Sequence, residues 1–164
     1  PEDRQRMGLV TEFKAHENLI FGYHHQEPYS KSSILQEKEI MSFSKKVMEE
    51  YDVRPTSPNL ITSNFSGGNQ QKIILSRELN ENPKVLLIGQ PTRGVDIGAI
   101  EFIHQRLIDM RDKGAAILLV SVELEEVLSL SDRIIVMFDG NIVGEKINKD
   151  VTDRDLGLLM AGVA

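Results

Sequence analysis

Apolar residues recur along the chain with two different spacings, and the change falls near residue 80. Before that point they recur every three or four positions, which is the spacing of one helical face. Ile40, Phe43, Val47 and Tyr51 form such a face. The first half is therefore predicted to be helical, with helices over residues 11–21, 32–51 and 67–80.

In the second half, short continuous apolar runs alternate with helical patterns. The run over residues 85–88, Val-Leu-Leu-Ile, is typical of a strand buried on both faces of a parallel sheet. The predicted strands cover 85–88, 116–120, 133–138 and 142–147, and the predicted helices cover 97–113, 123–130 and 152–162. This alternation predicts an α/β fold, with a parallel sheet covered by helices.

Turn and capping residues mark the ends of these elements. Ser32 or Ser33 is the expected N-cap of the helix that ends at residue 51, and Asp96 that of the helix that starts at 97. Gly114 is expected to stop the latter helix. The Asp-Gly-Asn sequence at 139–141 predicts a hairpin turn.

Composition narrows the class of protein. The chain has 164 residues, 40% hydrophobic and 27% charged, which suits one globular domain with a core. No apolar run is long enough to cross a membrane. The net charge of −6, without a basic block, argues against nucleic acid as a partner. No cysteine is present, which excludes disulfides and cysteine-ligated metal. The chain begins at Pro1 without an initiator Met, so we expect a piece of a longer protein.

One stretch carries candidate chemistry, namely residues 65–72, Phe-Ser-Gly-Gly-Asn-Gln-Gln-Lys, which we call the signature stretch. Ser66 and the amides of Gly67 and Gly68 are expected at the positive end of a helix dipole. Such a turn can bind an anion such as a phosphate. Taken alone, however, the same residues are more often a surface helix with Ser66 as its N-cap.

Two further motifs follow the signature stretch in a specific order. Residues 85–96 combine an apolar strand with a Pro-Thr-Arg-Gly-Val-Asp turn, and residues 121–126 follow another apolar strand. Together the three motifs resemble the signature, the Walker B strand with its D-loop, and the switch segment of the ATP-binding subunit of ABC transporters. The resemblance covers essentially the whole chain, including the Pro-Glu-Asp-Arg sequence at 1–4.

The resemblance is strongest to the second ATPase half of fused, double-domain importers of simple sugars and nucleosides, and the sequence around His104 favours the nucleoside branch. It implies a helical signature subdomain, with the end of the Q-loop region, over residues 1–84. It also implies the C-terminal part of a RecA-like P-loop ATPase core over residues 85–164.

Several positions depart from the family pattern. No Gly-x-x-x-x-Gly-Lys-Ser/Thr loop occurs, so the loop that cradles the phosphates of a nucleotide is missing. Gly89 stands where the family has the aspartate that organises Mg²⁺, and Gln90 stands where it has the glutamate that activates water. Val122 replaces the switch histidine, and Glu2 replaces the glutamine that opens the helical insert. The resemblance therefore implies that this chain's own ATP site is catalytically dead.

The other half of the family's composite site is retained. In the family, two ATPase domains enclose each ATP head to tail, and one of them supplies the signature and the D-loop. The residues expected to contact the ATP of a partner domain are Ser66, Gly67, Gly68, Asn69, Gln70 and Asp96. The resemblance thus implies ATP as the cofactor, with Mg²⁺ held by the partner site, and no metal site of the chain's own.

The resemblance also implies partners and a location. The partners would be a second ATP-binding domain, the fused N-terminal half, and transmembrane permease subunits. The location would be cytoplasmic, on the inner face of the cell membrane. The parent protein would hydrolyse ATP, whereas this part alone would be inactive.

Three alternatives stay open at this point. The chain could be a structural or regulatory ATPase-like module without a role at a live site, or, less favoured, an unrelated nucleotide-binding α/β domain. His24, His25 and Glu27 could bind a metal, although a solvated loop is favoured.

The missing phosphate loop also has a structural consequence. Without a phosphate-loop strand, the strands at 85–88 and 116–120 would keep an unpaired flank. We expect that flank to be covered by another chain in a non-native oligomer, or to be rearranged locally.

Overall fold

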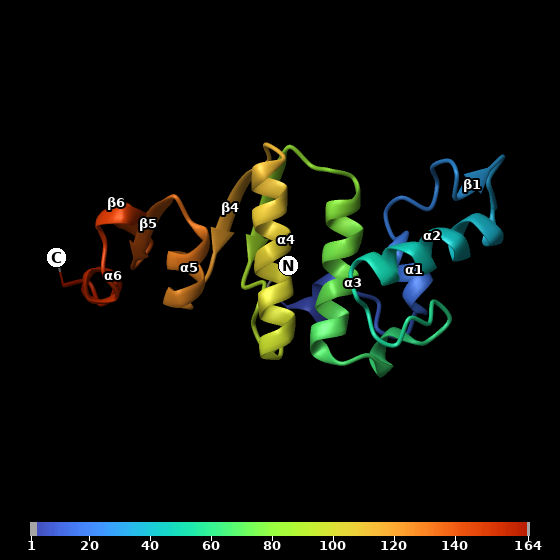
Figure 1. Cartoon of the computed structure of the whole chain (residues 1–164), viewed down its shortest axis with the longest axis horizontal. Coiled ribbons are helices and arrows are strands. Elements are labelled where there is room, and N and C mark those ends of the chain that lie inside the picture. Colours follow the sequence, from blue (N-terminus) through green and yellow to red (C-terminus); the bar gives the residue numbers. More distant parts are fainter. Residues whose placement is uncertain (1–2, 164) are drawn as a thin grey trace. The chain divides into compact units, whose positions relative to one another are not determined.

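The structure is a computed structural model that describes residues 3–163 (Figure 1). The expectations for Pro1 and Glu2 lie outside these residues. The chain forms two compact units that divide inside strand β4 (Ala116–Val120), between Ile117 and Leu118. This division differs from the expected boundary after residue 84, which separates segments by role and stays a prediction.

Most helices belong to the first unit. Its elements are η1 (Arg4–Gly8), α1 (Ala15–Leu19), β1 (Ser30–Lys31), β2 (Ile34–Leu35), α2 (Glu37–Glu50), η2 (Thr62–Asn64), α3 (Gly67–Asn80), β3 (Val85–Gly89) and α4 (Ile97–Asp112). After β4, the second unit contains α5 (Leu124–Leu130), β5 (Arg133–Phe138), β6 (Asn141–Ile147), η3 (Asn148–Asp150) and α6 (Asp153–Met160).

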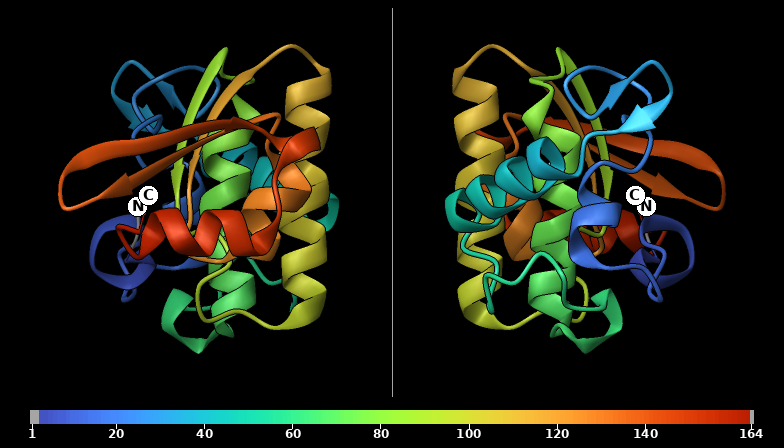
Figure 2. Two further views of the ribbon diagram at one scale, coloured as in Figure 1. Left: turned by 90° about the vertical axis from the view of Figure 1, so that its left-hand side faces the viewer. Right: turned by 90° about the vertical axis from the view of Figure 1, so that its right-hand side faces the viewer.

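Helix α3 is the centre of the first unit. It contacts α1, α2, α4 and η1, so that neighbours lie on several of its sides (Figure 2). The apolar run Ile73, Ile74 and Leu75 is buried, as is Leu79 one turn later. A helix surrounded in this way needs apolar residues on more than one face, which explains why α3 is less amphipathic than a surface helix.

Local sequence signals located α3, α4 and the hairpin of the second unit. The helix predicted over 67–80 is confirmed as α3. Asp96 is the N-cap of α4, and Gly114 follows that helix with a φ of +94°. Asp139 and Gly140 both have positive φ in the turn between β5 and β6, as a tight hairpin turn requires.

The beginning of the helical half was predicted less well. Ser32 and Ser33 do not cap α2: they have φ values of 50° and 63° in the turn that joins β1 to β2. The N-cap of α2 is Gln36, so the helix starts five residues later than expected. Helix α1 is also shorter than predicted, and residues 4–8, for which no helix was predicted, form the π-helical turn η1.

The sheet is smaller than the sequence pattern predicted. Strands β3 and β4 are hydrogen-bonded neighbours in a parallel pair. Within residues 3–163, β5 pairs with β6 alone, in antiparallel register from Arg133 opposite Ile147 to Phe138 opposite Asn141. The strand at 133–138 is therefore not a third member of the parallel pair. It packs instead against α6 through Ile134, and Leu156 is fully buried there.

One face of β3 lies open. Leu86 is buried, whereas Val85 and Leu87 are 64% and 73% exposed, so the expected burial on both faces is wrong for this strand. The strand itself is regular, without the local rearrangement that we expected as one outcome. Coverage by another chain stays a prediction. Within the described part of the chain, no helix has the length and apolar character needed to span a bilayer.

Candidate functional site

Ser66 occupies the N-terminus of α3, where its side chain is exposed. As N-cap, its Oγ accepts hydrogen bonds from the Asn69 amide N at 3.4 Å and from Asn69 Nδ2 at 2.9 Å. Within residues 3–163 the hydroxyl donates no hydrogen bond. Ser66 thus caps the helix and still has an O–H for an acceptor outside the chain.

Gly67 and Gly68 are the first two residues of α3, so their amides have no acceptor within the helix. Neither glycine has a positive φ, so what each provides is space. A Cβ on Gly67 would lie 2.6 Å from Arg4 Nη2, and a Cβ on Gly68 would lie 2.7 Å from Asp96 Oδ2. Gly67 is half-buried and Gly68 is buried, so the Gly67 amide is the more accessible to an anion.

Asn69 and Gln70 hold the loop that precedes the helix. Asn69 Oδ1 accepts a hydrogen bond from the backbone amide of Arg54 at 2.7 Å. The buried Gln70 side chain donates from Nε2 to the carbonyl oxygens of Thr62 at 3.2 Å and Phe65 at 3.1 Å. The structure therefore directs the Gln70 amide inward, away from the outward-facing serine hydroxyl, and gives it a structural role.

Asp96 stands at the start of α4, next to the start of α3. Its Oδ1 accepts from the Ala99 amide at 2.9 Å, which caps α4, while its Oδ2 lies against Gly68. The turn before it, residues 90–96, is called the D-loop turn below. It contains Gly94 at a φ of +65°, a conformation that favours glycine. Two motifs that are separated in the sequence by residues 73–89 thus meet at the N-termini of two packed helices.

A residue outside the predicted site lies between these motifs. Arg4 donates from Nη1 to the Arg93 carbonyl at 2.6 Å and from Nη2 to the Gly94 carbonyl at 3.1 Å. Its Nε is buried and has no hydrogen-bond partner among the described residues. Neither periodicity nor charge indicated this contact, because it joins positions 89 and 90 residues apart. The only sequence signal was the resemblance of residues 1–4 to the family.

The three degenerate positions lack the chemistry of the family residues. A Cβ on Gly89, at the end of β3, would meet nothing within 4 Å, so a carboxylate is absent although there is space for one. Gln90 follows in the left-handed region with a φ of 51°. Val122, in the second unit, is 63% exposed and offers no imidazole.

The residues at the start of α3 fit a phosphate better than a metal ion. Ser66 offers a hydroxyl, Gly67 an amide and α3 the positive end of its dipole, and Arg4 adds a cation close by. The described residues contain no group of three or more His, Asp or Glu side chains arranged to hold a metal. His24 and His25 contact each other edge-on, with ring centroids 5.7 Å apart, beside an open hollow that Glu27 also lines.

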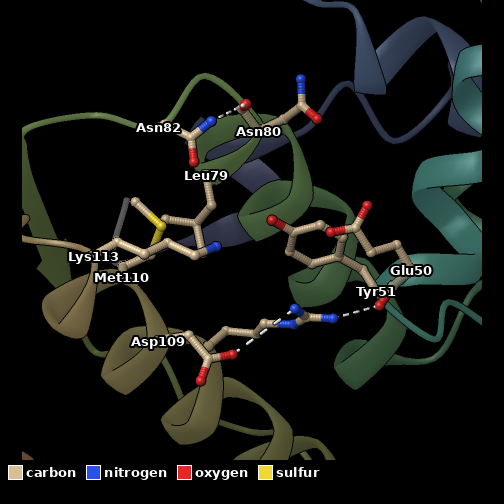
Figure 3. A pocket seen from close by; sticks show the side chains of 9 residues that line it. Glu50, Tyr51, Leu79, Asn80, Asn82, Asp109, Met110 and Lys113 are labelled. Atoms are coloured by element: carbon tan, nitrogen blue, oxygen red, sulfur yellow. Dashed lines mark hydrogen bonds and ion pairs between the residues drawn. The ribbon is translucent and has the colours of Figure 1, made fainter.

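A pocket of about 240 Å³ lies at the C-terminal ends of α2 and α3, beside α4 (Figure 3). Arg106 crosses it: the guanidinium donates to the Glu50 carbonyl at 2.5 Å and lies 4.8 Å from the centre of the Tyr51 ring. Burial raises the pKa of the Tyr51 hydroxyl. The guanidinium also lies 3.9 Å from Asp109. The arginine in this pocket is engaged in holding α2 to α4.

Comparison with known proteins identifies the class. Two solved structures of ATP-binding cassettes match the fold with TM-scores of 0.68, each at 24% sequence identity and over 60% of its length. One is a dimer in a post-hydrolysis state with ADP and phosphate, and its match covers 88% of this chain. The other is nucleotide-free, and its match covers 93% of this chain. At this identity the likeness establishes the fold alone. The fold is that of an ATP-binding cassette.

Sequence relatives add the family. The chain is 46% identical over 162 residues to the guanosine import ATP-binding protein NupO of Bacillus subtilis. It is 48% identical over 162 residues to the nucleoside import ATP-binding protein NupA of Lactococcus lactis. It is also 35% identical over 161 residues to the ribose import ATP-binding protein RbsA of Streptococcus agalactiae.

These alignments cover 98–99% of this chain and 32% of each relative, so the chain spans about a third of the length of the relatives it matches. No protein-family model matches the chain. The chain belongs to the family of ABC-transporter ATP-binding proteins, and its relatives include those of nucleoside and sugar importers.

Proposed function

We propose that the chain is the C-terminal ATPase part of the ATP-binding subunit of an ABC importer, and that it completes the ATP site of a partner domain. The observation that carries this proposal is the exposed Ser66 hydroxyl at the start of α3, packed beside the start of α4 at Asp96. The same chain offers no carboxylate at Gly89. It therefore has the groups that bind a phosphate of ATP held by a partner domain, and it lacks the groups that support hydrolysis in its own site.

Each group of the phosphate-facing surface has a defined contribution. The Ser66 hydroxyl donates one hydrogen bond to the terminal phosphate of an ATP held by the partner. The Gly67 amide donates a second, and the dipole of α3 favours the negative charge. Groups fixed in this way before the reaction stabilise developing charge without reorganising, which is electrostatic catalysis. Gly68, Asn69, Gln70 and Asp96 keep this surface in shape through the contacts described above.

The chain's own site is proposed to be inactive for chemical reasons. Gly89 has no side chain to organise Mg²⁺, which would instead be held by the partner site together with the ATP. The Gln90 amide can orient a water but cannot accept its proton as a carboxylate does. Val122 offers no hydrogen bond to a phosphate. Hydrolysis would thus depend on the partner domain's residues and on this chain's signature stretch.

The transported substrate is proposed to be a nucleoside. The two relatives named for guanosine and nucleoside import share 46% and 48% identity with the chain, against 35% for the ribose importer. The partner domain would be the fused N-terminal half of the same subunit. The permease would lie in the membrane, with this chain on its cytoplasmic face.

A substitution at Ser66 tests the proposal in the full importer. Ser66→Arg removes the hydroxyl donor and fills the surface with a long side chain. We expect the kcat of ATP hydrolysis to fall by about a hundredfold or more, the loss seen when one preorganised donor is removed. Ser63→Arg is the matched control, because Ser63 is an exposed serine of η2 three residues earlier whose side chain has no hydrogen bond within the described part.

The outcome also separates the proposal from its rival. Unchanged hydrolysis in Ser66→Arg, with a folded and assembled protein, would refute a role at the partner's site. Unchanged hydrolysis in Gly67→Ala as well would favour a structural or regulatory module. A loss in Ser66→Arg alone, with Ser63→Arg active, supports the contribution of the signature stretch to catalysis.

A further inference from the structure

Arg4 contacts both motifs of the candidate site with a single guanidinium group. Its two terminal nitrogens donate to the consecutive carbonyls of Arg93 and Gly94, in the D-loop turn. The same Nη2 atom lies 2.6 Å from the position that a Cβ on Gly67 would take. The guanidinium thus fills the space between the D-loop turn and the first residue of α3.

This contact explains why a glycine stands at position 67. Gly67 does not have a positive φ, so its backbone conformation is open to other residues. A methyl group there would meet Arg4 Nη2 at 2.6 Å and the Gly94 carbonyl oxygen at 3.1 Å. Both atoms belong to the same hydrogen bond, so an alanine would push that bond apart.

Arg4 is itself fixed to α3 through its neighbours in η1. The Asp3 carboxylate caps this turn by accepting from the amides of Gln5 and Arg6 at 3.1 Å. Gln5 Nε2 donates to Gln70 Oε1 at 3.1 Å. At the other end of η1, the buried Arg77 side chain donates to the Gly8 carbonyl at 2.9 Å.

Two contacts seven residues apart on α3 therefore hold η1 along that helix. The Arg4 side chain leaves η1 towards the D-loop turn, so the turn is tied indirectly to α3. The two bonds to the D-loop turn depend on the planar guanidinium group of an arginine, which can donate to two carbonyls at once. A lysine, with a single ammonium group, cannot reproduce both bonds in the same geometry.

We propose that Arg4 is a positioning residue, which holds the D-loop turn against the start of α3 so that Ser66 and Asp96 are presented together. This inference rests on the proposed function, because it assigns Arg4 a role in shaping the surface that meets the partner's ATP. Arg4 acts through the backbone of the D-loop turn and through Gly67, while its guanidinium nitrogens bond to carbonyls of the chain itself.

The first test compares Arg4 variants in the full importer. Arg4→Met and Arg4→Lys should lower the kcat of ATP hydrolysis by about tenfold or more, since small displacements of catalytic groups have effects of this size. The KM for ATP should change less than about twofold, because the nucleotide is bound mainly by the partner. Arg6→Met is the matched control: Arg6 is the exposed arginine of the same turn, and its side chain makes no hydrogen bond or ion pair within residues 3–163.

The second test is a double-mutant cycle between Arg4 and Gly67. Gly67→Ala should lower kcat in the native background and lower it several-fold less in Arg4→Ala, where the methyl group has space. The unfolding temperature should show the same non-additivity, and this readout does not depend on ATP. Additive effects in both measurements, or native kcat in both Arg4→Met and Arg4→Lys, would overturn the inference.

The two proposals fail in different ways. If Ser66→Arg leaves hydrolysis unchanged, the proposed function fails, and the Arg4–Gly67 coupling in unfolding temperature still shows whether the contact exists. If Ser66→Arg abolishes hydrolysis and the Arg4 variants keep a native kcat, only the positioning role of Arg4 fails. An Arg4→Ala protein that does not fold is replaced in the cycle by Arg4→Lys, which keeps the charge.

Discussion

Gly68 in α3 and Asp96 at the start of α4 approach each other so closely that no side chain fits between them. A Cβ on Gly68 would lie 2.7 Å from Asp96 Oδ2 and 2.9 Å from the Ala99 Cβ. Asp96 cannot easily move away, because its other oxygen accepts the capping bond from the Ala99 amide. The glycine at position 68 therefore sets how closely the two helix N-termini approach.

Gly68→Ala is expected to lower the free energy of unfolding by about 1–3 kcal/mol, the usual effect of overpacking. Urea unfolding followed by circular dichroism measures this change. Gly98→Ala is the matched control in the first turn of α4, where a Cβ would be 3.6 Å from Asp96 Oδ1, an ordinary contact. That control should be neutral or stabilising by up to about 1 kcal/mol, since alanine is the better helix former. Equal effects of the two substitutions would contradict the packing explanation.

Elements whose boundaries depend on nearby residues were predictable from the sequence. Helix α3 begins after the Ser66 cap and α4 after the Asp96 cap, and both caps are formed by residues within three positions. The start of α2 was missed because Ser32 and Ser33 are used in a hairpin turn instead of a cap. The same residue types, serine among them, occur at helix N-caps and in turns, so the sequence alone does not distinguish the two uses.

In the candidate site, too, features set by nearby residues were predictable and features set by distant residues were not. The exposed position of Ser66 followed from its place before a helix. The inward direction of Gln70 did not, because its side chain is held by Gln5, 65 residues away, as well as by Thr62 and Phe65. The Arg4 contact also joins distant segments, and no local pattern records which distant carbonyl a side chain will reach.

Gly89→Asp is expected to be tolerated by the fold, within about 0.5 kcal/mol of the native free energy of unfolding. The reason is that the Cβ would point into open space, with nothing within 4 Å. Gly68→Asp, the same substitution at a crowded position beside a carboxylate, should be destabilising by several kcal/mol. Chemical denaturation of the two variants tests the contrast. A large loss at Gly89 would show that the family's aspartate is excluded there by packing.

Arg106→Ala is expected to lower the free energy of unfolding by about 1–3 kcal/mol. The side chain is mostly buried, donates to the Glu50 carbonyl, and lies 5.1 Å from the Phe102 ring centre as well as over Tyr51. Cation–π contacts and a charge-assisted hydrogen bond together account for a change of this size. Arg106→Lys should recover only part of it, because an ammonium group stacks less well on two rings.

The control for this prediction is Lys113→Ala, which removes a cation just after the same helix. Lys113 is exposed, and its side chain makes no hydrogen bond or ion pair within the described part of the chain. Its loss should change the free energy of unfolding by no more than about 0.5 kcal/mol. If Lys113→Ala and Arg106→Ala destabilise equally, the effect comes from the charge of the helix terminus, and the stacking explanation is wrong.

The last prediction concerns pH. Hydrogen bonds from Arg54 and from Lys72 hold the pKa of the Asp52 carboxyl below its usual 3.8. Lys72 also lies 4.7 Å from the Phe102 ring centre, so Asp52 connects the end of α2 to α3 and α4. Because the pKa is lower in the folded state, this carboxylate stabilises the fold above the unfolded pKa. That stabilisation is lost as the pH falls through the folded value.

Asp52→Asn tests this dependence without disturbing the backbone, since asparagine tolerates the positive φ of 48° at this position. The variant should unfold at a lower temperature than the native protein, by a constant amount above about pH 5. Below about pH 4 the difference should shrink, because the native carboxylate then becomes protonated and loses its charged partners. Thermal unfolding from pH 3 to 7 measures it, with Glu39→Gln, at an exposed position of α2, as the control for removing one negative charge. A difference between Asp52→Asn and native protein that does not change with pH would show that these hydrogen bonds do not depend on the charge of Asp52.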